Sequence, residues 1–250
     1  MLSEFIMSRS NERKPITLAY EADSLRSFLR YLCRQGLLRG DFVKHVPKIP
    51  ALRETVPSVW SQEDFTRLLA AVDRNTPGGR RDYAILLLAG RLGMRIGDIR
   101  TLRLDDLRWD ELRLETIQAK TGRPLSLPLT EEIGKALINY LRNGRPKTHH
   151  REVFLRNKAP FEPFAPRTNL HHMISTYRRR AGIIFPTGRR VGLHSLRHTA
   201  ASRLLEVGTP LATISCVMGH LSSETTRMYT KIDIEELRSV AMAVEDEEDA

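Results

Sequence analysis

The sequence has only two cysteines, Cys33 and Cys216, among 250 residues. They are too few and too far apart for a disulfide framework or a zinc site. Both have apolar neighbours in the sequence, and we expect them to be small core side chains in a reducing compartment. The longest apolar run, Tyr83–Ala89, is too short to span a membrane, and the polar residues 8–14 do not resemble a signal peptide. These absences predict a soluble cytoplasmic protein that does not contact a membrane.

The sequence also lacks a Walker-type phosphate loop and a convincing cluster of metal-binding residues. We therefore expect no metal and no other cofactor. Apart from an acidic C-terminal tail, no internal repeat or low-complexity segment stands out. The hydrophobic fraction of 41% is ordinary for a globular protein, and 250 residues suffice for one large domain or for a domain with a smaller companion.

The charge balance is strongly basic. Forty Lys and Arg residues against thirty Asp and Glu residues give a net charge of +10 and a sequence pI near 10.0. Five of the acidic residues occupy positions 245–249, so the rest of the chain carries +15. A basic body of this kind favours a polyanionic partner, usually nucleic acid, with a basic protein that has no such partner as the alternative.

Apolar spacing predicts a mainly α-helical chain with one small antiparallel β-sheet, an α+β fold. Residues 112–117 and 125–129 alternate apolar and polar side chains around the Thr121-Gly122 turn, and residues 153–155 are a further candidate strand. Ser61 is expected to cap a helix. The expected helices cover residues 18–37, 81–91, 131–141, 168–180, 194–207, 211–218, 224–230 and 234–244.

A domain boundary is expected near residue 57. Prolines at positions 47, 50 and 57 prevent Val46–Pro57 from being helical throughout, and this stretch is interpreted as a linker. We expect a helical N-terminal part with its linker at 1–56, a larger domain at 57–244 and an acidic tail at 245–250.

Two segments near the C-terminal end carry residues suited to phosphate chemistry. His194 and Arg197 are three residues apart on a predicted helix and project from the same face. Arginine offers a fork of donors that matches phosphate oxygens, and histidine can donate a hydrogen bond or relay a proton. His220 follows a glycine that permits a tight turn, and Tyr229 comes nine residues later. Taken alone, each segment is more commonly explained by a surface histidine and arginine, or by a turn histidine and a buried tyrosine with a satisfied hydroxyl.

Two further segments carry candidate cations. Gly93-Met94-Arg95 leads into a short predicted helix, where Arg95 has a packed base and Asp98 can orient a neighbouring arginine. Lys120 lies at the hairpin tip, from which it can reach a reacting oxygen and donate a proton. A solvated arginine beside a helix cap and an exposed turn lysine are the plain alternatives.

The ordered set of these residues resembles the tyrosine recombinase, or phage integrase, family of Xer/integrase type. The most similar stretches are GMRIGDIRTLRLDDL, AKTGRPLSLPL, GLHSLRHTAASRLLEVG and VMGHLSSETTRMYT, between about residues 59 and 232. The resemblance implies a tyrosine recombinase catalytic domain, preceded by a truncated helical core-binding domain of which residues 17–50 are recognisable.

The resemblance also implies a role for each residue of the motif. Tyr229 is then the nucleophile, Arg95 and Arg197 hold the scissile phosphate, and Lys120 is the general acid. His194 and His220 are two further ligands of the active site. Asp98 stands where relatives commonly have glutamate, which preserves a supporting role. The implied reaction is site-specific DNA integration, excision or inversion, typical of a mobile genetic element, through a 3′-phosphotyrosyl intermediate.

The implied partners are double-stranded DNA and further copies of the chain, as a tetramer on two DNA sites. A C-terminal helix at 234–244 would dock on a neighbouring protomer or within its own chain. For any one basic residue a solvated surface is the alternative to a DNA contact. Contacts with the DNA backbone are expected from Lys44, Lys48, Arg123, Arg156, Lys158, Arg178, Arg179, Arg180, Arg189 and Arg190.

Two other functions are compatible with parts of the sequence. A truncated DNA-binding remnant would occupy or regulate a site without strand exchange. A type IB topoisomerase would use the same chemistry to relax supercoils, but the stretches HSLRHTAAS and GHLSSETT resemble integrases more closely.

Overall fold

The chain divides into two compact units, Met1–Thr55 and Val56–Ala250, in a computed structural model. The structure describes residues 2–9, 12–13, 15–50, 58–166, 168, 170–186, 189 and 191–219. The helices expected at 224–230 and 234–244 and the acidic tail at 245–250 therefore lie outside the described residues. The roles expected for the segments 1–56, 57–244 and 245–250 stay predictions.

The N-terminal unit consists of α1 (Leu2–Ser8), α2 (Pro15–Arg34) and the short 3-10 helix η1 (Val43–His45). Leu18 and Leu29 lie on the buried face of α2 and pack with Ile6 of α1, as the apolar spacing predicts. The helix begins three residues before the expected start, with a proline in the first turn where its missing N–H costs nothing. Apolar spacing does not predict α1, because a helix this short depends on tertiary contacts such as that of Ile6.

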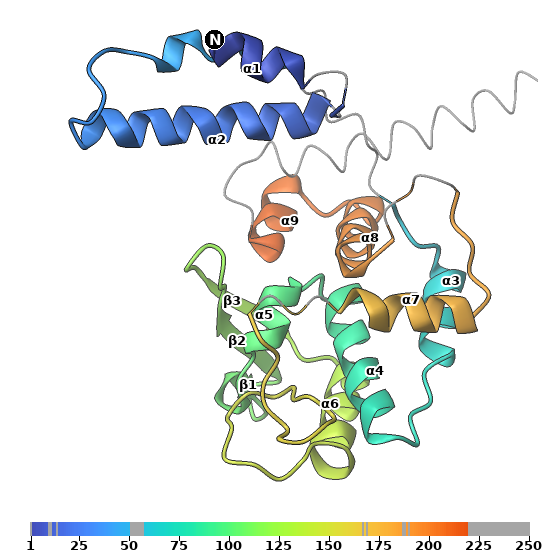
Figure 1. The fold of residues 1–250 in the computed structure, drawn as a ribbon. Coiled ribbons are helices and arrows are strands. Elements are labelled where there is room, and N and C mark those ends of the chain that lie inside the picture. The colour runs from blue at the N-terminus through green and yellow to red at the C-terminus, as the bar shows by residue number, and fades with distance from the viewer. Residues whose placement is uncertain are drawn as a thin grey trace, which may run out of the picture. The chain divides into compact units, whose positions relative to one another are not determined.

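The second unit is mostly helical with one small sheet (Figure 1), which confirms the expected fold class. Its elements in chain order are α3 (Gln62–Ala70), α4 (Pro77–Gly90), α5 (Ile96–Thr101), η2 (Leu104–Asp106), β1 (Leu107–Arg108), β2 (Arg113–Ile117), β3 (Pro124–Pro128), α6 (Glu131–Asn143), α7 (His171–Arg180), α8 (Leu193–Glu206) and α9 (Leu211–Met218).

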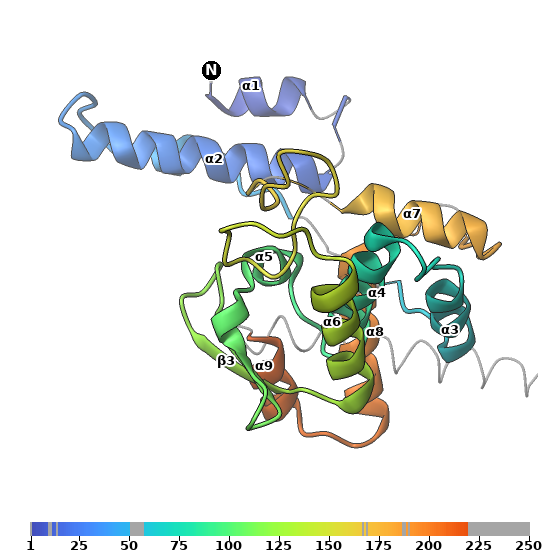
Figure 2. The ribbon, with the colours of Figure 1, turned by 90° about the horizontal axis from the view of Figure 1, so that it is seen from below.

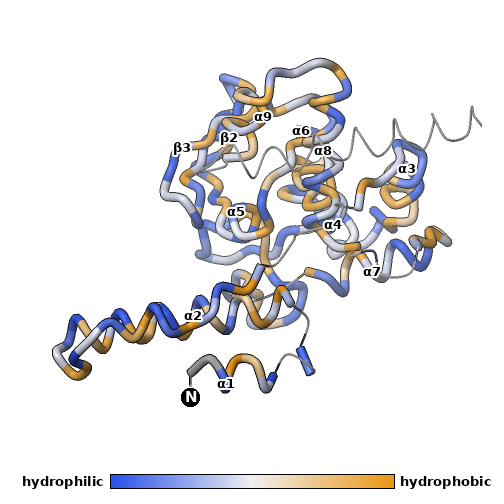
Figure 3. Tube along the Cα trace, turned by 90° about the horizontal axis from the view of Figure 1, so that it is seen from above, coloured by the Kyte–Doolittle hydropathy of each residue, from blue (hydrophilic) through white to orange (hydrophobic). Residues whose placement is uncertain are grey.

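Helix α4 is the centre of this unit. The side chains of residues 84–89 are almost completely buried, so α4 is apolar on every side rather than along one stripe. Helices α6 and α8 both pack against it, and α4 and α6 lie side by side in Figure 2. Hydrophobic residues gather where these three helices meet (Figure 3), which places the core there.

The sheet is antiparallel in the order β1-β2-β3. Glu115 pairs with Ser126, and Leu114 and Leu127 face the core, as the alternating pattern predicts. Gly122 has a φ of +66°, which a glycine adopts without strain in the turn between β2 and β3. The expected hairpin is therefore present.

The strand expected at residues 153–155 is absent. This segment forms only two isolated bridges, Arg103 with Glu152 and Leu155 with Pro163. Val153, Phe154 and Leu155 are all fully buried, so the apolar run reflects burial on all sides and not membership of a sheet.

The expected positions of both cysteines in the core are wrong. Cys216 is exposed on α9, because that helix buries its opposite face through Ile214 and Met218. Cys33 is half-buried near the end of α2, where its Sγ lies 3.4 Å from the carbonyl oxygen of Gly40. Ser61, in contrast, caps α3 as expected and accepts a hydrogen bond from the Asp64 N–H. Within the described ranges, no helix has both the length and the apolar character needed to cross a bilayer.

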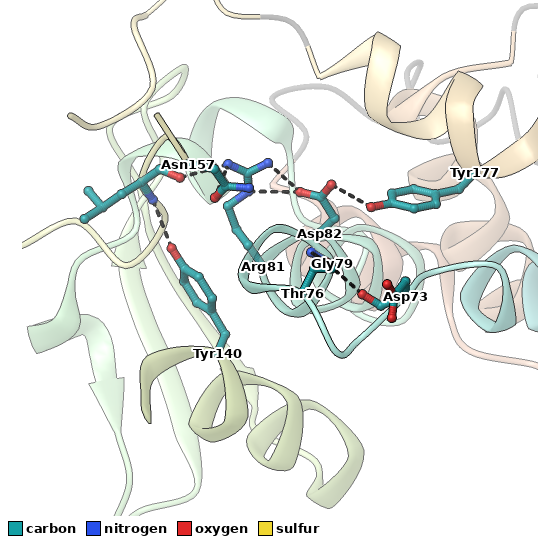
Figure 4. Close-up of polar contacts among 9 residues, drawn as sticks. Asp73, Thr76, Gly79, Arg81, Asp82, Tyr140, Asn157 and Tyr177 are labelled. Atoms are coloured by element: carbon teal, nitrogen blue, oxygen red, sulfur yellow. Dashed lines mark hydrogen bonds and ion pairs between the residues drawn. The ribbon is translucent and has the colours of Figure 1, made fainter. Parts of the chain in front are cut away.

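A polar network centred on the buried Asp82 and Tyr177 ties α4 to α7 and to the long segment that precedes α7 (Figure 4). The Asp82 carboxylate accepts hydrogen bonds from the Arg81 guanidinium at 2.7 and 2.9 Å and from the Tyr177 hydroxyl at 2.9 Å. Arg81 also donates to the Leu155 carbonyl at 3.0 Å and to Asn157 Oδ1 at 2.9 Å. Because α7 and the 155–157 segment share one charged anchor, their positions on α4 are fixed together.

We expect Tyr177→Phe to lower the free energy of unfolding by about 2 kcal/mol, because it removes a buried hydrogen bond to a charged group. Urea titration of the full chain, followed by circular dichroism, measures the change. Tyr83→Phe, on the partly buried ring of Tyr83 in α4, is the matched control and should change stability by less than about 0.5 kcal/mol. Equal effects of the two substitutions would contradict the importance of the Asp82 contact.

Candidate active site

Arg197 joins three separate parts of the second unit. It lies on α8 with only 5% of its surface exposed. Its guanidinium donates hydrogen bonds to the carbonyl oxygens of Gly93, which precedes α5, and of Met218, which ends α9. Gly93 has a φ of +64°, so the turn that presents its carbonyl to Arg197 suits a residue without a side chain.

Arg95 lies beside Arg197 and points toward the same corner of the unit, where the turn at Gly93 meets the end of α9 at Met218 and Gly219. It is the N-cap residue of α5, and its Nη2 donates to the Gly219 carbonyl oxygen at 2.6 Å. Gly219 ends α9 in the left-handed conformation, with a φ of +55°. The two arginines therefore bind consecutive carbonyl groups, those of Met218 and Gly219, at the point where the chain leaves α9.

Asp98 links this cationic pair to the hairpin. Its Oδ2 lies 4.0 Å from Arg95 Nη1, and its Oδ1 accepts a hydrogen bond from the Ala119 N–H at 2.9 Å. Burial raises the pKa of this carboxyl, and the Ala119 N–H and the charges of Arg95 and Arg197 act in the opposite direction. The carboxylate thus orients Arg95 and also holds the turn that carries Lys120.

His194 lies among the same cations. Loss of hydration lowers its pKa, and the positive charges of Arg197, Arg95 and Lys120 lower it further. His194 and Lys120 are both exposed, whereas Arg197 is buried. The structure therefore brings together four of the six expected catalytic residues and the supporting Asp98, with Arg197 buried, Arg95 half-buried, and His194 and Lys120 exposed. Tyr229 and His220 lie outside the described residues.

Three buried polar atoms at this corner have no hydrogen-bond partner among the residues that the structure describes. They are Arg95 Nη1, Asp98 Oδ2 and Gln118 Nε2. Arg95 Nη1 is an N–H donor of a guanidinium group, and such a donor suits an anion with several acceptor oxygens, such as a phosphodiester. The described residues contain no group of three or more His, Cys, Asp or Glu side chains that would hold a metal ion.

Three residues of this region were not singled out by sequence reasoning. Gln118 is 1% exposed directly after β2, and a polar side chain at that place gives no sign of burial. Trp60 donates from Nε1 to Ser195 Oγ at 2.7 Å, an interaction across 135 residues that no local pattern could indicate. His198 follows Arg197 directly in the motif HSLRHT, and its position in that motif could have identified it.

The basic residues expected to contact DNA are mostly exposed. Arg156 has an ion pair with Glu162 at 3.7 Å, and Arg178 is half-buried in the last turn of α7. Arg190 lies outside the described residues. Their contacts with DNA stay predictions. The exposed members are Lys44, Lys48, Arg123, Arg156, Lys158, Arg179, Arg180 and Arg189.

Solved structures share this fold. A XerH site-specific recombinase bound to a palindromic difH substrate aligns with 98% of this chain and 72% of its own, with a TM-score of 0.79 and 19% identity. A lambda integrase dimer bound to a core site aligns with 91% of this chain and 77% of its own, with a TM-score of 0.70 and 16% identity. At these identities the likeness establishes the fold alone.

The sequence itself establishes the family. The model of the phage integrase family matches residues 59–236. The putative integrase/recombinase y4gC of Sinorhizobium fredii is 37% identical over 188 residues, which cover 75% of this chain and 95% of that protein. The chain therefore belongs to the phage integrase family, as its motifs predicted.

Other relatives are longer than this chain. The putative integrase/recombinase y4rA of Sinorhizobium fredii is 38% identical over 94% of this chain, but the match spans 56% of that protein. Tyrosine recombinase XerD of Listeria innocua is 29% identical over 93% of this chain and 77% of its own length. The chain thus spans about half the length of y4rA and about three quarters of the length of XerD.

His198 makes the stability of the chain depend on pH. Burial, together with the positive charges of His194 and Arg197, lowers the pKa of His198 from 6.5 to about 4. The folded state therefore binds fewer protons than the unfolded state between these values, so this contribution is complete above pH 6.5 and is lost as the pH falls toward 4.

We expect the wild type to lose about 2 kcal/mol of stability between pH 7.5 and pH 5 through this group alone. Urea titrations at the two pH values measure the loss, and His198→Gln, which cannot take up the proton, should lose less by about that amount. An identical pH dependence of the two proteins would contradict the lowered pKa.

Proposed function

We propose that the chain is a site-specific DNA recombinase that cleaves and rejoins DNA strands through a 3′-phosphotyrosyl intermediate at Tyr229. The observation that carries this proposal is the convergence of Arg95, Arg197, His194 and Lys120 at the end of α9. Tyr229 is ten residues beyond Gly219, whose carbonyl Arg95 binds.

The two arginines counter the main electrostatic barrier to the reaction. A phosphodiester carries a negative charge that repels nucleophiles, and charge grows on its non-bridging oxygens during attack. Preorganised donors such as Arg95 and Arg197 each stabilise that charge by about 3 kcal/mol. Their charge also favours the phenolate form of tyrosine, whose ordinary pKa is about 10.

Proton transfer completes the proposed reaction. The Tyr229 oxygen forms a bond with phosphorus while the bond from phosphorus to the 5′ oxygen breaks. His194 and His220 bind the phosphate or take up the tyrosine proton, and the Lys120 ammonium gives a proton to the departing 5′ oxygen. Attack by a 5′ hydroxyl on the phosphotyrosyl bond reverses the steps, so the strands are rejoined without an external energy source.

The proposed partners are double-stranded DNA and three further copies of the chain on two DNA sites. One neighbour in fold is a lambda integrase tetramer bound to a Holliday junction, with a TM-score of 0.69. The positive charge of the chain supports a polyanionic partner. Acting on DNA, the protein would work in the cytoplasm. The N-terminal unit would serve as a core-binding domain and the second unit as the catalytic domain. No finding favours a remnant without strand exchange.

We expect wild-type protein to form a covalent adduct with nicked suicide duplexes built from the DNA that flanks the gene. A nick close to the cleavage site releases the 5′ hydroxyl as part of a short strand, so the intermediate accumulates. Tyr229→Phe should form no adduct, because it lacks the attacking oxygen. Denaturing gels detect the adduct, and mass spectrometry of its peptide maps the linkage.

Tyr177→Phe, which changes a buried tyrosine hydroxyl on α7, serves as the control for loss of a phenol. Adduct formation by Tyr229→Phe would rule out Tyr229 as the nucleophile. Tight binding of the same duplexes without any wild-type adduct would overturn the proposed enzyme.

We also expect affinity for duplex DNA to fall steeply as salt rises, because phosphate contacts release counterions. Replacing both Arg178 and Arg179 with alanine should weaken binding and reduce the slope of log affinity against log salt by about 1 per lost contact. Fluorescence anisotropy over a salt series measures the slope. Lys135→Ala, on the surface of α6 beside Glu131, removes one positive charge away from α7 and should leave the slope unchanged. A slope that does not depend on Arg178 and Arg179 would remove them from the DNA interface.

A further inference from the structure

Gln118 closes the turn that presents Lys120. Its Oε1 accepts a hydrogen bond from the Thr121 hydroxyl at 2.7 Å. Its backbone N–H donates to the Arg123 carbonyl at 2.9 Å, and its own carbonyl accepts from the Gly122 N–H at 2.8 Å. Both the main chain and the side chain of Gln118 therefore hold the residues that follow Lys120.

The same amide group lies against the end of α9. A Cβ atom added to Gly219 would lie 2.1 Å from both Gln118 Oε1 and Gln118 Nε2, which is closer than any real contact. The Gly219 backbone therefore lies against the edge of the amide group that carries its oxygen and nitrogen. Since Arg95 binds the Gly219 carbonyl, the Gly219 backbone lies against both Gln118 and Arg95.

Asp98 holds the other side of the turn, through the Ala119 N–H at 2.9 Å. The residues on both sides of Lys120 are thus fixed by buried groups, Asp98 on one side and Gln118 on the other, while Lys120 itself is exposed. Gln118 Nε2 is buried and has no hydrogen-bond partner among the described residues. Gln118 therefore joins the Lys120 turn to the end of α9 through a buried amide group.

We infer that Gln118 is a positioning residue that sets the reach of Lys120 toward the scissile phosphate, by locking its turn against the Gly219 corner. The inference rests on the proposed function, in which Lys120 protonates the departing 5′ oxygen. Gln118 does not touch the reacting atoms. It acts through Lys120, so its loss should impair proton donation and leave phosphate binding and attack by Tyr229 largely intact.

A duplex with sulfur in place of the scissile 5′ bridging oxygen separates these steps. When the phosphorus–sulfur bond breaks, the sulfur leaves as a thiolate, which is stable near neutral pH and needs no proton from the enzyme. With oxygen, the same bond cleavage needs the Lys120 proton. A defect in proton donation is therefore rescued by sulfur, whereas a defect in the fold, in phosphate binding or in the nucleophile is not.

We expect Gln118→Ala and Thr121→Val to cleave the oxygen duplex about 10- to 100-fold more slowly than wild type, because misplacement of a catalytic group by about 1 Å has effects of this size. Both variants should cleave the sulfur duplex close to the wild-type rate. Lys120→Ala, with a larger loss on oxygen and the same rescue by sulfur, is the positive control. Single-turnover rates on suicide duplexes give each value.

Thr116→Val makes the same chemical change as Thr121→Val on the same hairpin, within β2, and should match wild type on both duplexes. Urea titration of each variant separates folding from catalysis. If Gln118→Ala is strongly destabilised, the cleavage rates of Thr121→Val test the inference instead. This variant keeps the buried amide and removes the hydroxyl that donates to Gln118 Oε1.

Equal losses on the oxygen and sulfur duplexes, or no loss on oxygen, would overturn the role of Gln118. Failure of sulfur to rescue Lys120→Ala would overturn the assignment of the acid, and this inference with it. Wild-type protein that cleaves neither duplex while binding both would instead overturn the proposed function itself.

Discussion

The hydrogen bonds from the buried Arg197 guanidinium to two distant backbone carbonyls hold the candidate site together. They tie the turn before α5 and the end of α9 to α8, and Arg95 and Asp98 build on the corner that they define. Carbonyl oxygens stabilise a buried cation through partial charge but do not neutralise it. The corner therefore keeps positive charge close to an exposed surface, where a phosphodiester can neutralise it.

Local physical chemistry made much of the fold predictable. The apolar period located α4, α6, α8 and α9, the Ser61 cap started α3, and the alternation around Thr121-Gly122 gave the hairpin. Prediction failed where burial is decided by distant segments. The run at 153–155 is apolar because it is enclosed, not because it pairs, and the exposed side of Cys216 is set by which face of α9 packs on α8. Neither fact can be inferred from the residues that lie next to these positions in the sequence.

The candidate site was predictable to a different extent. The family motifs identified Arg95, Lys120, His194 and Arg197, whose gathering in space the structure describes. The motifs gave no indication of how these side chains are held. The bonds of Arg197 to Met218, of Asp98 to Ala119 and of Gln118 to Thr121 depend on elements far apart in the sequence or on a buried amide inside a strand pattern. Residues that support a site through backbone contacts leave weak sequence signals, because a carbonyl can belong to any residue.

The hydrogen bond from Tyr177 to Asp82 affects which residues of α7 can be substituted during evolution. Tyr177 is fixed in the interior by its hydroxyl, while the next three residues, Arg178–Arg180, end the same helix with exposed or half-buried basic side chains. Exposed residues on a firmly held helix can be exchanged with little effect on stability, usually within about 0.5 kcal/mol. A surface of this kind can therefore drift toward new ligands while the reaction centre and the core stay as they are, so the scaffold and its preference for a partner can evolve separately.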